Sequence, residues 1–164
     1  MHDLVIVALG SNLGEPRSQV RCAIERLRGL SDYPLIESDL WQTTPVDCPP
    51  GSPRFVNAVV GLRPRLGQTP ESLLAKLQEI EREFGREPKR VINEARPLDL
   101  DLIAFGKETR GLQNLVLPHP RAHVRRFVLQ PLSEIAPRLV LPGQIHTVEE
   151  LLQSLSQDTV MRRL

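Results

Sequence analysis

The feature that most constrains this chain is an unbroken aliphatic run at its start. Residues 4–9 have the sequence LVIVAL, and Gly10 follows them directly. Six successive apolar residues closed by a glycine are typical of a strand that is buried on both faces of a sheet. We therefore expect this strand to lie inside the fold.

Two helical patterns and three further strand patterns follow this run. The first helix is expected over 16–30, and the second begins at the Thr-Pro-Glu of residues 69–71. An N-cap, a first-turn proline and an early acid together mark a helix start. The strands are expected over 36–41, 55–62 and 98–105. The order strand, helix, strand, strand, helix, strand predicts an α+β fold, a ferredoxin-like βαββαβ sandwich.

The last third of the chain carries shorter patterns. Helices are expected over 127–135 and 148–155, which gives the sandwich a C-terminal helical extension. Pro131 must lie in the first turn of its helix or bend it, because proline lacks the N–H that a helix interior uses. No internal repeat or linker is visible, so residues 1–164 are expected to form a single domain.

Composition and charge exclude several classes of protein. The chain has 164 residues, 40% hydrophobic and 25% charged, with a formal net charge of +1. It therefore lacks the basic field of a protein that binds nucleic acid without sequence preference. No apolar run approaches the roughly 18 residues that a membrane helix needs. Cys22 and Cys48 are too few for a disulfide scaffold, and no signal peptide precedes the first strand, so we expect a soluble cytoplasmic protein.

The motif that most strongly indicates chemistry is the alternation of Leu and Asp over 98–102. Side chains alternate along a strand, so Asp99 and Asp101 should project from one face and the leucines from the other. Two carboxylates side by side among aliphatic residues repel each other and are costly to desolvate. A hard cation such as Mg²⁺ relieves both problems. An exposed strand end with two solvated acids is the alternative.

Basic residues flank this motif. All but three of the 21 Lys and Arg residues are arginine, whose planar fork suits phosphate, although a coding bias explains the same excess. Residues 86–96 bring cations directly before the acids, and residues 118–127 hold His119, His123 and three arginines. Both segments could neutralise phosphates. Alternatively, the first is a solvated charged loop, and the second places its charged residues on the surface of a helix start and the loop before it. A zinc site at the two histidines lacks an obvious third ligand.

Two further pairs could contact a ligand. Gln78 and Glu81 lie at i, i+3 on the second helix, so they share a face and could point a donor and an acceptor at it. Phe55 and Asn57 alternate onto one face of a strand, where a ring could stack on a flat heterocycle and an amide could bind its edge. Surface polarity for the first pair and core packing for Phe55 are the alternatives.

Taken together, six short segments resemble the 6-hydroxymethyl-7,8-dihydropterin pyrophosphokinase family. They are ALGSNLG at 8–14, FVNA at 55–58, QEIE at 78–81, GR at 85–86, ARPLDLDL at 95–102 and LPH at 117–119. The resemblance extends from residue 5 to about residue 140. It implies an enzyme of folate biosynthesis that moves the terminal diphosphate of ATP onto the hydroxymethyl group of the pterin and releases AMP.

The resemblance also implies the residues of the site. Two Mg²⁺ ions are implied at Asp99 and Asp101. The pterin pocket is implied at Thr43, Thr44, Val46, Phe55, Asn57 and Phe127. Contacts with ATP are implied at Gln78, Glu81, Leu102, His119 and Arg125. Arg86 and Arg96 are implied to assist catalysis, with Asp99 and Asp101, from a loop and its end.

The chain departs from the family pattern within that loop. The family carries an arginine two residues after the one that matches Arg86, and this chain has Pro88 there. An arginine–tryptophan pair of the family is absent from residues 92–95, which are Ile-Asn-Glu-Ala, so no tryptophan covers the substrate. Lys89 or Arg90 could supply the missing charge. A family tyrosine after the Pro-His pair is Pro120 here, outside the loop.

Two other functions fit parts of the sequence. A nucleotidyltransferase also uses a Gly-Ser turn and a D-x-D pair, but most of the domain separates Gly10 from Asp99 here. A non-catalytic ferredoxin-like module that binds a small molecule would not need the acid pair. The expected partners are ATP and 6-hydroxymethyl-7,8-dihydropterin, with no nucleic acid and no membrane. A monomer is expected, and a dimer is left open.

Overall fold

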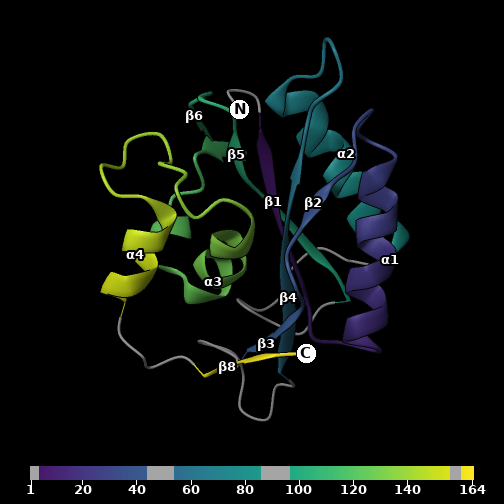
Figure 1. Cartoon of the computed structure of the whole chain (residues 1–164). Coiled ribbons are helices and arrows are strands. Elements are labelled where there is room, and N and C mark those ends of the chain that lie inside the picture. Colours follow the sequence, from purple (N-terminus) through teal and green to yellow (C-terminus); the bar gives the residue numbers. More distant parts are fainter. Residues whose placement is uncertain (1–3, 44–53, 86–96, 156–159) are drawn as a thin grey trace.

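The computed structural model describes residues 4–43, 54–85, 97–155 and 160–164 (Figure 1). In chain order the elements are β1 (Val5–Ser11), α1 (Pro16–Arg28), β2 (Ile36–Glu37), β3 (Trp41–Thr43), β4 (Phe55–Leu62), α2 (Pro70–Glu83), β5 (Asp99–Phe105), β6 (Arg110–Leu112), β7 (Leu115–Leu117), the 3-10 helix η1 (Ala122–Val124), α3 (Arg126–Ile135), α4 (Val148–Ser154) and β8 (Met161–Arg163). Within these residues, no helix combines the length and the apolar character needed to cross a membrane.

One antiparallel sheet forms the centre of the molecule. Strands β5, β1, β4, β3 and β8 lie side by side in that order, and β2 also pairs with β4. With β2 and β3 counted as two parts of one strand, the elements from β1 to β5 follow the order βαββαβ. The predicted α+β class and ferredoxin-like sandwich are confirmed.

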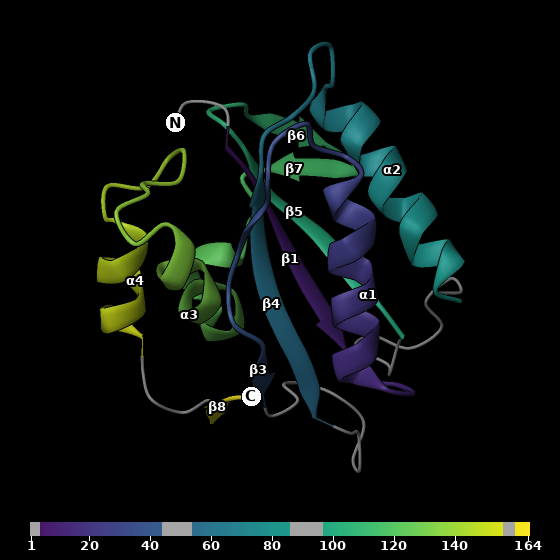
Figure 2. The same ribbon diagram turned by 45° about the vertical axis from the view of Figure 1, so that its right-hand side comes forward.

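Helices cover both faces of this sheet (Figure 2). α1 and α2 lie on one face, where their apolar stripes pack with Val5, Val7 and Leu9 of β1. α3 and α4 lie on the other face and pack with Ile6 and Ala8. Every residue of β1 is buried, which confirms the strand expected from the N-terminal aliphatic run.

The second helix begins where the sequence predicts. Thr69 is its N-cap, with Pro70 in the first turn. The Thr69 hydroxyl accepts a hydrogen bond from the Ser72 N–H, and the Ser72 hydroxyl accepts one from the Thr69 N–H. This capping box satisfies donors that the first turn otherwise leaves without partners. Leu73, Leu77 and Ile80 then form the buried stripe that fixes α2 on the sheet.

The strand expected over 36–41 is divided in the structure into β2 and β3. Glu37 pairs with Val60, and Trp41 pairs with Asn57. The chain therefore advances by four residues from Glu37 to Trp41 while β4 advances by only three. One extra residue of this kind is a β-bulge. The serine that follows Glu37 keeps the bulge hydrogen-bonded, because its N–H and its hydroxyl both bond to the backbone of β4. The prediction of one continuous strand is therefore wrong.

The C-terminal extension adds short strands to the two helices that the sequence predicts. β6 and β7 form a hairpin, and β8 returns to the main sheet beside β3. α3 continues through Pro131, which lies beyond its first turn. α4 starts at a capping box between Thr147 and Glu150. The extension thus covers the face of the sheet that α1 and α2 leave open.

Candidate active site

The two acids of β5 lie on one face of the sheet, as predicted. Leu98, Leu100 and Leu102 are buried in the core beneath α1 and α2. Asp99 and Asp101 alternate with them and are half-buried on the opposite face, where Asp101 pairs with Ala8, which packs with α3 and α4. The two carboxylates therefore project toward the side that α3 covers.

The register of β1 brings this acid pair to the residues expected at the pterin pocket. Gly10 pairs with Asp99 of β5 on one side and with Asn57 of β4 on the other. Directly paired residues in antiparallel strands project to the same face. Phe55, two positions from Asn57 on β4, shares that face and pairs with Thr43. We call the face that carries Asp99, Asp101, Asn57, Phe55 and Thr43 the site face.

A buried hydrogen bond fixes the orientation of the Asn57 amide. The Thr43 hydroxyl donates to Asn57 Oδ1 at 2.7 Å, and both side chains are buried. The amide nitrogen then remains on the side toward Gly10, where an added Cβ would lie 3.0 Å from Asn57 Nδ2 and 3.8 Å from Phe55 Cδ1. The missing side chain of Gly10 therefore leaves room for an amide donor and a ring edge, side by side, on the site face.

His119 contributes a neutral donor near the acids. Its backbone N–H donates to the Ile103 carbonyl at 2.8 Å, which holds it against β5. Burial lowers the pKa of its imidazole, as does the positive charge of Arg125, while the negative charge of Asp99 opposes the shift. Nδ1 accepts a hydrogen bond from the Arg121 N–H at 3.2 Å. The neutral ring therefore carries its proton on Nε2.

Arg125 and Phe127 lie at the start of α3. The Arg125 guanidinium carbon is 5.3 Å from the centroid of the Phe127 ring, within the range of a cation–π contact. Phe127 packs against the buried apolar residues between the sheet and α3 and α4, and α3 is in contact with β4, the strand of Phe55. The two aromatic residues expected at the pterin pocket thus belong to facing elements, one on the sheet and one on the helix that covers it.

The residues expected to contact ATP from α2 and β5 differ in their surroundings. Glu81 is buried, and its Oε2 accepts a hydrogen bond from the Leu100 N–H at 2.7 Å. Because Leu100 lies between Asp99 and Asp101, this bond fixes β5 to α2 at the position of the two acids. Gln78 is exposed, although it lies on the same helix three residues earlier. The Leu102 side chain is in the core, which leaves its backbone for contact with a ligand.

The acid pair fits a magnesium site by the chemistry of its donors. Carboxylate oxygens are the ligands that Mg²⁺ prefers, and the ion usually binds through one or two carboxylates plus water and phosphate. In the part of the chain that the structure describes, no group of three or more His, Cys, Asp and Glu side chains could hold a metal ion. Within those residues a zinc site at His119 and His123 therefore has no third ligand, and phosphate and water would complete a magnesium site at Asp99 and Asp101.

Several expected site residues lie outside the described residues. These are Thr44, Val46, Arg86 and Arg96, together with Lys89 and Arg90, the two candidates for the missing loop charge. Asn93 of the same loop, for which no role was expected, also lies outside them. Two residues for which no role was expected also contribute to the site. Gly10 acts there by its missing side chain, and buried Ser11 donates its hydroxyl to the Pro97 carbonyl at 2.5 Å, just before the acids. Their sequence signal was a Gly-Ser pair after a buried strand, within the segment 8–14 that resembles the family.

Comparisons with known proteins identify the family of the chain. The sequence model of a family described as 7,8-dihydro-6-hydroxymethylpterin-pyrophosphokinase (HPPK) matches residues 6–137. A 2-amino-4-hydroxy-6-hydroxymethyldihydropteridine pyrophosphokinase of Pseudomonas aeruginosa is 42% identical over 148 residues, covering 90% of this chain and 89% of that protein. The enzyme of the same name from Haemophilus influenzae is 37% identical over 157 residues, 95% of each chain.

Solved structures show the same fold in a longer chain. Wild-type HPPK-DHPS of Plasmodium falciparum with pteroate aligns with a TM-score of 0.71 at 14% identity and covers 92% of this chain. This chain spans 42% of that protein's length. The likeness at this identity concerns the fold, and the relationship itself rests on the sequence matches. The chain belongs to the 7,8-dihydro-6-hydroxymethylpterin-pyrophosphokinase family and is a pyrophosphokinase of folate biosynthesis.

Proposed function

We propose that this enzyme transfers the terminal diphosphate of ATP to the hydroxymethyl group of 6-hydroxymethyl-7,8-dihydropterin, releases AMP and requires Mg²⁺. One observation carries the proposal: Asn57 and Asp99 flank Gly10 on the site face. Two strand spacings, about 10 Å, separate the backbones of β4 and β5. That span suits a substrate whose flat ring is bound at Asn57 and whose substituent reaches the acids.

The reaction needs alignment and charge neutralisation more than covalent chemistry. The hydroxyl oxygen bonds to the β-phosphorus, the bond from that phosphorus to the oxygen bridging the α-phosphate breaks, and the hydroxyl proton passes to solvent. Two magnesium ions held by Asp99 and Asp101 would supply positive charge to the phosphate oxygens. The Nε2–H of His119 would donate a hydrogen bond to a phosphate oxygen, and Arg125 would pair with another.

The aromatic residues and Asn57 would hold the second substrate. Phe55 and Phe127 would enclose the two faces of the pterin ring, and the Asn57 amide would donate to an acceptor on its edge. Thr43 would keep that amide oriented through its 2.7 Å hydrogen bond. Orientation of the ring in this way would keep the hydroxymethyl group directed toward the acid pair.

An assay of AMP formation tests the proposal. Purified protein is incubated with ATP, Mg²⁺ and 6-hydroxymethyl-7,8-dihydropterin, and AMP is quantified with and without the pterin. We expect AMP only when the pterin is present, and we expect its loss when EDTA removes the metal. AMP that does not depend on the pterin contradicts the proposal, as does full activity in EDTA.

Gly10→Ala tests the assignment of the pterin pocket. The added Cβ would lie 3.0 Å from Asn57 Nδ2 and would force the amide away from the ring edge. We expect the KM for the pterin to rise about tenfold, equivalent to about 1.4 kcal/mol, with little change in the KM for ATP. Gly111→Ala is the matched control, because a Cβ there meets no atom within 4 Å. Equal KM values for both variants would reject the pocket.

The loop residues are assigned to phosphate by their resemblance to the family pattern. Arg96→Ala is expected to lower kcat more than it raises either KM, because its charge would act on the transition state. Lys89→Ala or Arg90→Ala should also lower kcat if one of them replaces the absent arginine. Steady-state kinetics of the three variants measure this. Unchanged turnover in both the Lys89 and the Arg90 variant would reject that replacement.

A further inference from the structure

The last strand of the chain completes the edge of the sheet beside the pterin pocket. Arg163 and Met161 of β8 pair with Trp41 and Thr43 of β3, and the Leu164 N–H donates to the Leu40 carbonyl at 2.9 Å. Figure 1 shows β8 beside β3. In the sequence, β8 follows the residues 6–137 that the family model matches. Thr43, which orients the Asn57 amide, therefore lies on β3, and β8 holds this strand in place.

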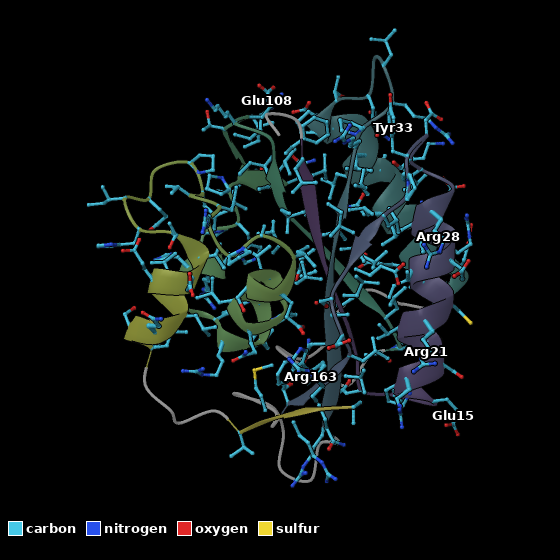
Figure 3. The ribbon with its side chains drawn as sticks, in the orientation of Figure 1. Glu15, Arg21, Arg28, Tyr33, Glu108 and Arg163 are labelled. Carbon is cyan, nitrogen blue, oxygen red and sulfur yellow. The ribbon has the colours of Figure 1, made fainter. Side chains whose placement is uncertain are left out.

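A polar cluster connects this edge to α3. Glu134 of α3 accepts hydrogen bonds from Trp41 Nε1 at 2.8 Å and from Arg163 Nη2 at 3.1 Å. The Arg163 side chain, labelled in Figure 3, also pairs with Asp39 at 3.1 Å, and its guanidinium carbon is 4.8 Å from the centroid of the Trp41 ring. We call Asp39, Trp41, Glu134 and Arg163 the Trp41 cluster. It joins β3, β8 and α3.

The Trp41 cluster lies next to the site face. Trp41 pairs directly with Asn57, so its ring projects from the sheet on the same side as Asn57 and Phe55. Glu134 belongs to α3, the helix that carries Phe127 in its first turn. The carboxylate therefore links the sheet that carries one proposed wall of the pterin pocket to the helix that carries the other.

We propose that the Trp41 cluster sets the separation of α3 from the site face, and thereby the width of the slot between Phe55 and Phe127. Glu134 and Arg163 are then positioning residues for the pterin, and the inference rests on the function proposed above. The Arg163 side chain is 57% exposed, so its ion pairs contribute little to stability. The hydrogen bond and the ring contact are directional, and their loss should change the binding of a flat ligand more than the stability of the fold.

Direct binding separates this inference from the catalytic proposal. The Kd for 6-hydroxymethyl-7,8-dihydropterin is measured by calorimetry with Mg²⁺ and a non-hydrolysable ATP analogue, and the Kd for the analogue is measured alone. Glu134→Leu and Arg163→Ala are expected to weaken pterin binding about tenfold and about threefold, with the analogue unaffected. Glu134→Gln, which keeps an acceptor for Trp41, should retain most of the affinity. The fluorescence of Trp41, the sole tryptophan, should change in Glu134→Leu.

Glu71→Leu is the matched control, because it removes a 2.6 Å ion pair with Arg110 between α2 and β6. We expect it to leave the Kd for the pterin unchanged. The inference is overturned if Glu134→Leu and Arg163→Ala bind the pterin like wild type, or if they lose pterin and analogue affinity in parallel. If Glu134→Leu does not fold, Arg163→Ala alone decides between these outcomes. Wild-type protein that binds the analogue but not the pterin overturns the proposed function as well.

Discussion

Replacement of Asp99 or Asp101 by asparagine is expected to lower kcat/KM at least about a thousandfold, which corresponds to about 4 kcal/mol of transition-state stabilisation. Both carboxylates are half-buried on one face of β5, and asparagine keeps their shape while it removes the negative charge that a cation requires. Steady-state kinetics with saturating Mg²⁺ measure the loss. The melting temperature of each variant is measured alongside, so that a loss of folding is not mistaken for a loss of catalysis.

Asp32→Asn is the control for the acid variants. This aspartate is 67% exposed and pairs with Arg65 on the surface, so the same chemical change there should leave kcat/KM unaltered. Retention of a tenth or more of wild-type activity by either acid variant would contradict the role of the pair. Lost activity accompanied by unimpaired binding of ATP and pterin would place that role in the chemical step.

Glu81→Leu is expected to lower the free energy of unfolding by about 1–3 kcal/mol, the cost of leaving a buried donor without an acceptor. The donor is the Leu100 N–H, 2.7 Å from Glu81 Oε2. Glu81→Gln keeps an acceptor of the same shape and should lose less. Because Leu100 lies between the two acids, Glu81→Leu should also lower kcat. Chemical denaturation and steady-state kinetics measure the two effects.

Glu79→Leu provides the comparison for Glu81→Leu. Glu79 is exposed on the same helix, and substitution there should change stability by no more than about 0.5 kcal/mol. If the two leucine variants were equally stable, the hydrogen bond to Leu100 would not hold β5. A raised KM for ATP in Glu81→Gln, with stability near wild type, would indicate that the carboxylate also contacts the nucleotide.

The long elements of the fold could be predicted from sequence because their patterns are local. The aliphatic run of β1, the capped stripe of α2 and the alternation of β5 each repeat a period often enough to identify the element. β6, β7 and β8 have three residues each, too few to show a period. They form because a partner strand lies beside them in the folded chain, and that is a tertiary property.

The candidate site likewise combines features that a local pattern predicts with features that only the folded chain brings together. Alternation alone places Asp99 beside Asp101 and Phe55 beside Asn57, whereas only the register of β1 brings the two pairs to the two sides of Gly10. Gln78 and Glu81 were expected to share a face. They lie about 60° apart around the helix, and the boundary of the buried stripe falls between them, so one is exposed and the other buried.

The Trp41 cluster could not be predicted from sequence at all. Trp41 and Glu134 are separated by 93 residues, and Arg163 follows Glu134 after another 29. No local pattern marks residues that meet only when β8 pairs with β3 and α3 covers the sheet. The same reason explains why the hydrogen bond from the Leu100 N–H to Glu81 could not be predicted, because these two residues also meet only in the folded chain.

The fate of an isotopic label distinguishes transfer of a diphosphate from transfer of a single phosphate. The enzyme is incubated with Mg²⁺, 6-hydroxymethyl-7,8-dihydropterin and ATP carrying ³²P in the β-position, and the products are separated. We expect the label in a pterin diphosphate, formed in equal amount with AMP. Label that remains in ATP, or that is recovered in ADP beside a pterin monophosphate, would contradict it.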